Sequence, residues 1–129
     1  MKRAVLMIGA LLLFPLQSTL ALGLGDLKVE SELNQKLEGR IDLVSVKPGD
    51  VINMSVRLAD PEVFKSAGLA RPHHLTQLRF EPVSTGENAG HIRVTSKERI
   101  REPALNFIIE AQWPNGRLLR EYTVLLSKP

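Results

Sequence analysis

The feature that most constrains the fold is a stretch near the C-terminal end, residues 103–126. Apolar and polar side chains alternate over 105–113 and again over 118–126, and a period of two is typical of a strand with one buried face. A Pro-Asn-Gly tripeptide at 114–116 separates the two runs. Proline presets φ for a turn, asparagine tolerates the next position, and glycine accepts a positive φ after it. The stretch therefore predicts a β-hairpin.

Shorter alternating runs precede this hairpin at intervals typical of small all-β domains. Strands are expected over residues 26–31, 38–45, 51–58, 75–83 and 91–96, with the hairpin supplying two more. Ile52, Met54, Val56 and Leu58 are expected to face inward in the third of them, 97–99 is expected to be a turn, and 71–74 a loop. Together these segments predict an antiparallel immunoglobulin-like β-sandwich of about seven strands, with a partly open barrel as the alternative.

The period changes once, at residues 60–68, where a short helix is expected. Asp60 is placed to cap its N-terminus, and Pro61 occupies a position where a missing N–H costs nothing. Gly68 can take the left-handed conformation after the last turn. Phe64 is expected to cover one end of a sheet.

The first 21 residues have the pattern of a secretory signal peptide. Lys2 and Arg3 precede an apolar run over 4–16, and small residues follow, with Thr19 at the minus-three position of a cleavage site after Ala21. An uncleaved anchor is the alternative. The expected organisation is a signal peptide over 1–21 and a single domain over 22–129. The chain has no cysteine, so the domain is expected to lack disulfides.

Charge and composition disfavour several classes of function. Without Lys2 and Arg3 the remaining chain carries 15 basic and 14 acidic residues and no basic run, so nucleic acid is not an expected partner. No second apolar segment is long enough to span a membrane. His73, His74 and His91 lack the companions of a metal motif, and there is no serine or cysteine nucleophile motif. We expect no enzyme, metal or cofactor.

The hairpin has apolar residues on both of its faces. A central strand covered on both sides would explain this pattern, and so would a surface that docks a partner. The outward apolar residues form the candidate patch, and flanking charges form its rim. These candidate partner-binding residues are Ile108, Leu119 and Leu125, with Arg117, Arg120 and Glu121 at the rim.

Several stretches resemble one known family. They include ALGLG at 21–25, SVKPGD at 45–50, PEVF at 61–64 and RVTS at 93–96, and the longest is WPNGRLLREYTVLL at 113–126. These stretches are similar to the N-terminal periplasmic domain of the FimV family, and the resemblance covers nearly all of the chain after residue 21. Family members are large inner-membrane proteins tied to type IV pilus assembly, twitching motility and cell-pole organisation.

The resemblance implies an exported, non-enzymatic interaction domain of the cell envelope, with envelope or pilus-assembly proteins as partners. In the family a peptidoglycan-binding LysM module, a membrane helix and a repeat region usually follow this domain; none lies within this sequence, so the hub function is not carried over. A glycan- or peptidoglycan-binding module is the alternative function. It is disfavoured because Trp113 and Tyr122 are the only residues of their kinds, and Trp113 is expected to anchor the core.

Overall fold

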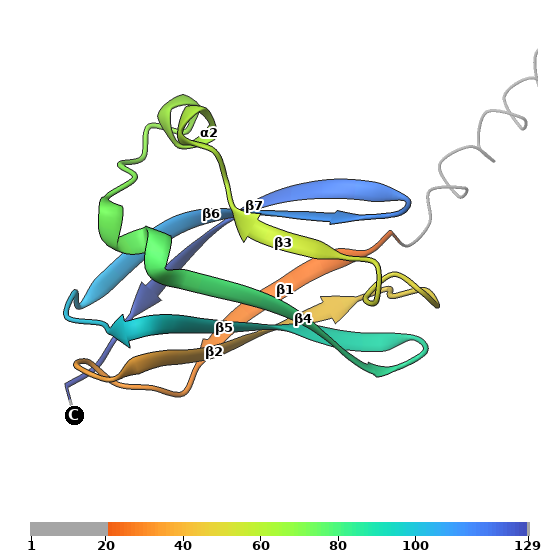
Figure 1. Ribbon diagram of the computed structural model, residues 1–129, viewed down its shortest axis with the longest axis horizontal. Coiled ribbons are helices and arrows are strands. Elements are labelled where there is room, and N and C mark those ends of the chain that lie inside the picture. The colour runs from red at the N-terminus through yellow and green to blue at the C-terminus, as the bar shows by residue number, and fades with distance from the viewer. Residues whose placement is uncertain (1–20, 129) are drawn as a thin grey trace, which may run out of the picture.

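A computed structural model describes residues 21–128, so the expected signal peptide over 1–21 lies almost entirely outside the described residues. Seven antiparallel strands form two sheets packed face to face (Figure 1). One sheet has the order β1 (Gly23–Val29), β2 (Lys36–Val44), β5 (Ala89–Arg99), β4 (Leu78–Gly86). The other has the order β3 (Ser55–Leu58), β6 (Ala104–Trp113), β7 (Gly116–Leu125). The predicted antiparallel β-sandwich of seven strands is confirmed.

The predicted hairpin forms β6 and β7, and β6 is the central strand of its sheet. The two strands pair without interruption from Ala104 opposite Leu125 to Trp113 opposite Gly116. Every residue from Phe107 to Ala111 is buried, on both faces of β6. Because β6 is covered on both sides, apolar residues occupy both of its faces, whereas a half-buried strand would alternate apolar and polar residues.

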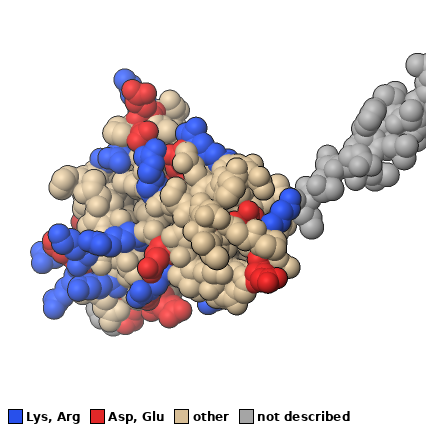
Figure 2. Space-filling view, turned by 45° about the vertical axis from the view of Figure 1, so that its right-hand side comes forward, with Lys and Arg blue, Asp and Glu red and all other residues tan. Residues whose placement is uncertain are grey.

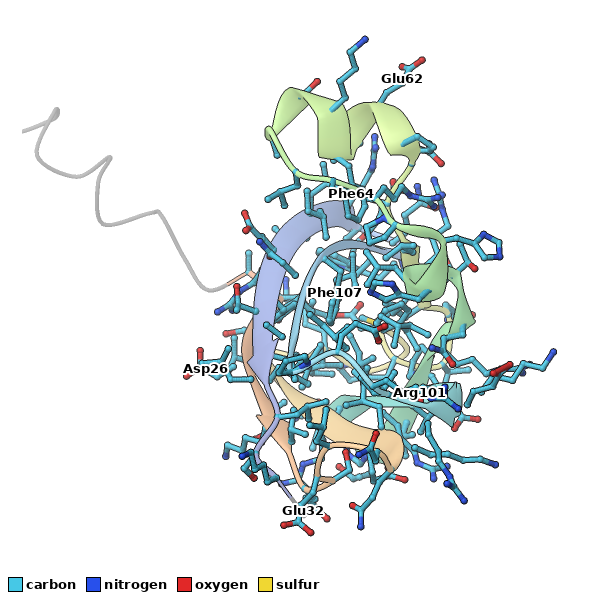
Figure 3. The ribbon with its side chains drawn as sticks, turned by 90° about the vertical axis from the view of Figure 1, so that its left-hand side faces the viewer. Asp26, Glu32, Glu62, Phe64, Arg101 and Phe107 are labelled. Atoms are coloured by element: carbon cyan, nitrogen blue, oxygen red, sulfur yellow. The ribbon has the colours of Figure 1, made fainter. Side chains whose placement is uncertain are left out.

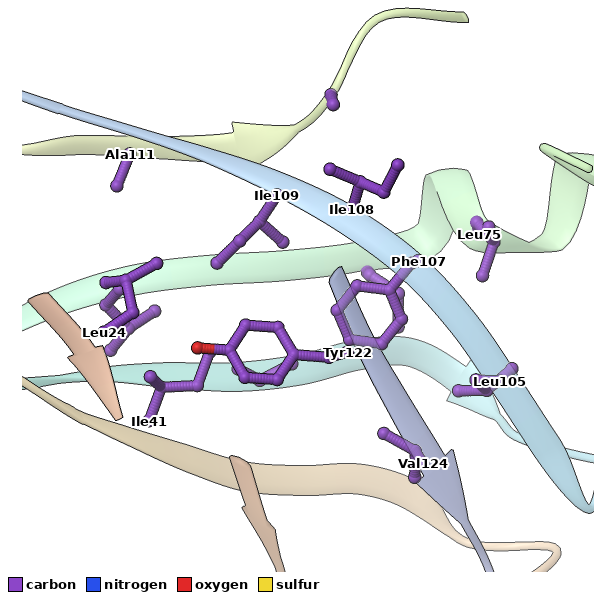
Figure 4. Close-up of a cluster of buried hydrophobic side chains, with 14 of the residues drawn as sticks. Leu24, Ile41, Leu75, Leu105, Phe107, Ile108, Ile109, Ala111, Tyr122 and Val124 are labelled. Atoms are coloured by element: carbon purple, nitrogen blue, oxygen red, sulfur yellow. The ribbon is translucent and has the colours of Figure 1, made fainter. Parts of the chain in front are cut away.

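The core lies between the sheets and is centred on Phe107. Its ring centroid is 5.9 Å from that of Phe80 on β4 and 6.2 Å from that of Tyr122 on β7. Figure 4 shows Phe107, Ile109 and Ala111 on one side of β6, and Ile108 on the other. The three rings thus join one strand of the first sheet to two of the second.

The hairpin turn differs from the prediction at Gly116. The positive-φ glycines of the described chain are Gly49 and Gly68, so Gly116 is not required for a left-handed conformation. Instead, a Cβ at Gly116 would lie 2.8 Å from the ring of Trp113. Glycine is needed there because the indole packs on its backbone. Trp113 itself is half-buried against the edge of the core rather than a central anchor.

The short helix is α2 (Pro61–Ser66), and most of its predicted features are present. Pro61 occupies the first turn, Gly68 has a φ of +74°, and the buried Phe64 lies beneath the helix (Figure 3). Asp60 is the N-cap residue, as predicted, but its side chain makes no hydrogen bond to the helix N-terminus. The Asp60 carboxylate instead accepts a hydrogen bond from Arg57 at 2.9 Å.

Several predicted strand boundaries are also wrong. The strand expected over 51–58 begins only at Ser55, because Asp50 accepts the backbone N–H of Lys47 and folds residues 47–53 into successive turns. Ile52, expected to face inward, is therefore exposed. The turn expected at 97–99 belongs to β5, which continues to Arg99 opposite Lys36. A 3₁₀ helix, η2 (His73–Gln77), replaces part of the expected loop and the start of the next strand.

Tyr122 connects the hairpin to β1. Its hydroxyl donates a hydrogen bond to the carbonyl of Gly25 at 2.8 Å, and its side chain is buried. Burial raises the pKa of Tyr122 from 10.0 to about 12, and the nearby Arg120 guanidinium opposes the shift only in part.

This pKa shift predicts a pH dependence of stability. A group whose pKa is raised by folding stabilises the fold fully below its unfolded pKa, and this contribution is lost as pH rises through the folded value. The free energy of unfolding should thus fall between about pH 10 and 12, by about 2–3 kcal/mol more in the parent than in Tyr122→Phe. Tyr122 is the only tyrosine, so tyrosinate absorbance reads its ionisation directly. A folded-state midpoint near 10 would contradict the assignment.

Candidate interaction surfaces

The predicted partner-binding patch is only partly assembled on one face. The pairing of β6 with β7 places Ile108 opposite Glu121, and Leu119 opposite Glu110, so all of these share the outer face of the sheet. Leu119 is 42% exposed and Leu125 78% exposed, as a docking surface requires. Ile108, however, is only 5% exposed. Its prediction as a surface residue is wrong because α2 lies against β6 and covers this part of the outer face.

Arg120 is also wrongly predicted as part of the rim. It lies opposite Ile109 and faces the other side of the sheet from Arg117 and Glu121. Its guanidinium donates to the carbonyl of Leu24, lies 3.3 Å from the Asp26 carboxylate, and stacks 4.9 Å from the centre of the Tyr122 ring. Arg120 therefore ties β7 to β1 and is not available to a partner on the outer face.

A buried carboxylate occupies the centre of this outer face. Glu110 is 3% exposed and lies 2.6 Å from Arg57 of β3, and it also forms an ion pair with Arg117 of β7. The Gln112 side chain donates to Glu110 at 3.3 Å. The burial of Glu110 could not be predicted from the sequence, because it depends on how three strands meet. This cluster of ion-paired side chains occupies the middle of the candidate patch. Leu119 and Leu125 are then the exposed apolar groups of the patch.

A hollow of about 770 Å³ lies where β3 meets β4, and it has no counterpart in the sequence predictions. Leu58 lines it from β3, Phe80 from β4, and Arg71 from the segment between α2 and η2. It extends across β4 as far as Arg93 on β5. Its volume lies within the range of about 300–1,000 Å³ that ligand pockets have.

A smaller hollow of about 320 Å³ lies at the end of the sandwich where β5 ends. Figure 2 shows Lys and Arg side chains gathered toward this end, left in the view, with fewer Asp and Glu among them. The basic side chains that line the hollow are Lys36, Lys97, Arg99 and Arg101. The molecule therefore has two separate basic recesses.

Several chemical features are not found in the part of the chain that the structure describes. Residues 21–128 hold no group of three or more His, Cys, Asp and Glu side chains that could bind a metal ion. Of the histidines, His74 lies 3.9 Å from Glu102. Within the same residues, no helix has the length and apolar character needed to cross a bilayer. What the structure offers is strand edges, a mixed apolar and charged outer face, and two basic recesses.

These features define an immunoglobulin-like β-sandwich with surfaces suited to binding. Residues 22–129 match the family described as "FimV N-terminal domain Ig-like domain", and the chain belongs to this family. It is 49% identical over 111 residues to the motility hub protein FimV of Pseudomonas aeruginosa strain PAO1 and to that of strain UCBPP-PA14. The match covers 84% of this chain but only 12% of the length of those relatives. No solved structure matches the chain significantly.

Proposed function

We propose that this domain is a non-enzymatic interaction module of the cell envelope that serves the assembly of type IV pilus, motility or cell-pole components. The observation that carries the proposal is the 49% identity to a motility hub protein over nearly the whole described domain. A hub acts by holding partners, and a β-sandwich with open edges and an exposed apolar patch is suited to that task. The signal-like residues 1–21 would direct the domain to the periplasm.

The outer face of the hairpin is one proposed contact surface. Leu119 and Leu125 are its exposed apolar groups, and Arg117 and Glu121 share the face with them. β7 is an edge strand of ten residues that pairs with β6 alone in the described sheets. Such an edge can accept a partner strand through main-chain hydrogen bonds, while neighbouring side chains add selectivity.

The glycan-binding alternative has less support in the structure. Carbohydrate sites commonly use an exposed aromatic face, and the only tryptophan is packed on the backbone of Gly116. The only tyrosine is buried and bonded to Gly25. Tyr122 is therefore not available as a platform, and Trp113 is only partly exposed.

A chimaera tests the proposed function. FimV of P. aeruginosa PAO1 would carry residues 22–129 of this chain in place of its matching region, in a strain that lacks its own FimV. We expect surface motility to return, and to be lost again in a chimaera with Leu119→Lys, which adds a charge to the apolar patch. Lys36→Glu, remote from the hairpin, is the control and should keep motility. Equal motility with and without the domain would contradict the proposal.

A further inference from the structure

The hollow between β3 and β4 is bordered by two strand edges that pair with nothing else in the described sheets. β3 pairs with β6 alone, and β4 pairs with β5 alone. An unpaired edge presents backbone N–H and C=O groups that can bind an extended chain. The direction of these groups can be worked out from the pairing on the other side of each strand.

On β3 the free groups belong to Val56 and Leu58. The N–H of Ala59 donates to the carbonyl of Ile108 at 2.9 Å, so Ala59 faces β6. Residues of an antiparallel strand alternate between facing their partner and facing away. The backbone N–H and C=O of Arg57, which lies opposite Glu110, therefore also face β6. The backbone N–H and C=O groups of Val56 and Leu58 point away from β6, toward the hollow that both residues line.

On β4 the free groups belong to Phe80. Pro82 lies opposite Ile92 and has no N–H to give, so this pair is one that does not hydrogen-bond within the ladder. Phe80 lies two residues before Pro82 and therefore has the same orientation in the ladder. Its backbone N–H and C=O point away from β5, outward from the free edge of β4. The proline interrupts this edge, whereas β3 has none, so β3 is the better template for a partner strand.

The charges of the hollow select the kind of chain that would bind. Arg57 is held by Asp60 and Glu110, and Arg93 is held by Glu38 at 2.9 Å. These pairs keep the pKa values of Asp60 and Glu38 below their ordinary range, through hydrogen bonds from the two guanidinium groups.

Two further arginines line the hollow without an ion pair to any residue that the structure describes. Arg79 has no carboxylate within 4.0 Å, and neither has Arg71, whose Nε donates to the carbonyl of Ala59 at 3.0 Å and whose guanidinium lies over Phe64. Glu81 is the one acidic lining residue. The unpaired charge in the hollow is thus positive.

We propose that this hollow binds an extended acidic peptide segment of an envelope protein. The peptide backbone pairs with the free groups of Val56 and Leu58, its carboxylates contact Arg79 and Arg71, and an apolar side chain packs on Phe80. This site rests on the proposed function, since it assigns a second contact surface to the same interaction module. It lies on the opposite edge of the sheet from β7, so the two surfaces can be separated by mutation.

The test uses the purified chain and synthetic peptides in which glutamate alternates with valine. Binding is measured by fluorescence anisotropy, and the site is located by changes in backbone amide NMR signals. We expect saturable binding, with the largest changes at Val56, Leu58 and Phe80. A matched peptide with lysine in place of glutamate should not bind, because it meets the same unpaired arginines.

Arg79→Glu is the decisive variant, since Arg79 forms no ion pair with the residues that the structure describes. Affinity for the glutamate peptide should fall at least about fivefold. Arg101→Glu makes the same charge change in the other basic recess and should alter affinity by less than about twofold. Val56→Pro removes one outward N–H from the edge of β3 and should also weaken binding. Circular dichroism would confirm that each variant is folded.

Three results would overturn the proposal. The glutamate peptide does not bind, the two arginine variants weaken binding equally, or amide changes fall outside the β3 and β4 edges. Vesicles that contain phosphatidylglycerol provide a further check: if they displace the peptide and Arg101→Glu impairs their binding as much as Arg79→Glu does, the basic surface binds anionic lipid instead. If a chimaera that carries Arg79→Glu still restores motility, the hollow has no role in motility, but the proposed function of the domain as an interaction module is not contradicted.

Discussion

Ile108→Lys is expected to destabilise the domain strongly, while Leu119→Lys is expected to leave its stability nearly unchanged. The two residues lie on the same face of the hairpin, but Ile108 is covered by α2 and Leu119 is 42% exposed. A lysine at 108 would place an ammonium group beneath the helix without a partner, at a cost of about 3–5 kcal/mol. That is a large fraction of the roughly 5–15 kcal/mol that stabilises a domain of this size.

Urea unfolding measures both variants, followed by circular dichroism and by the fluorescence of Trp113, the only tryptophan. The Leu119→Lys protein should differ from the parent by no more than about 0.5 kcal/mol, as exposed substitutions usually do. If Ile108→Lys is as stable as the parent, α2 does not hold its place on β6, and Ile108 returns to the candidate patch.

The hairpin could be predicted because its signals are local. Alternation over 105–113 and the Pro-Asn-Gly turn depend on neighbouring residues alone, and the structure shows both strands within a residue or two of the predicted positions. The sandwich followed from the number and spacing of such runs. The turns at 51–53 escaped prediction, because the alternation of apolar residues from Val51 to Leu58 continues through them. The Asp50 side chain, which accepts the N–H of Lys47, and a backbone hydrogen bond from Asn53 to Gly49 hold this segment in turns instead.

The surface of the hairpin could not be predicted in the same way. Alternation shows that Ile108 and Leu119 face the same side, but not that α2, which is distant in sequence, covers only one of them. For the same reason Arg120 resembled a surface charge, although it bonds to Leu24 on β1. The hollow between β3 and β4 could not be predicted either, because it forms only where strands of the two sheets come together. Its arginines, spread from 57 to 93, form no motif in the sequence.

Phe107→Ala should cost about 3–5 kcal/mol, the range for emptying a fully buried aromatic site. The side chain has no exposed surface, and it contacts the rings of Phe80 and Tyr122. Removing it leaves a cavity between the sheets, because the strands around it are fixed by their ladders and cannot close the gap. Urea unfolding measures the loss. Phe107→Leu should cost less because it keeps more of the volume, and Leu125→Ala, at an exposed site on the same hairpin, should cost about 0.5 kcal/mol or less.

Phe107→Ala also tests whether the core supports the hollow between β3 and β4. Phe80 packs on Phe107 and also lines the recess, with its backbone N–H and C=O at the free edge of β4. Loss of the Phe107 ring should therefore loosen Phe80 and weaken binding of the glutamate peptide, even at temperatures where Phe107→Ala is still folded. If folded Phe107→Ala binds the peptide with unchanged affinity, the strand ladders alone maintain the shape of the hollow. A destabilisation below about 1 kcal/mol would show that Phe107 does not join the two sheets.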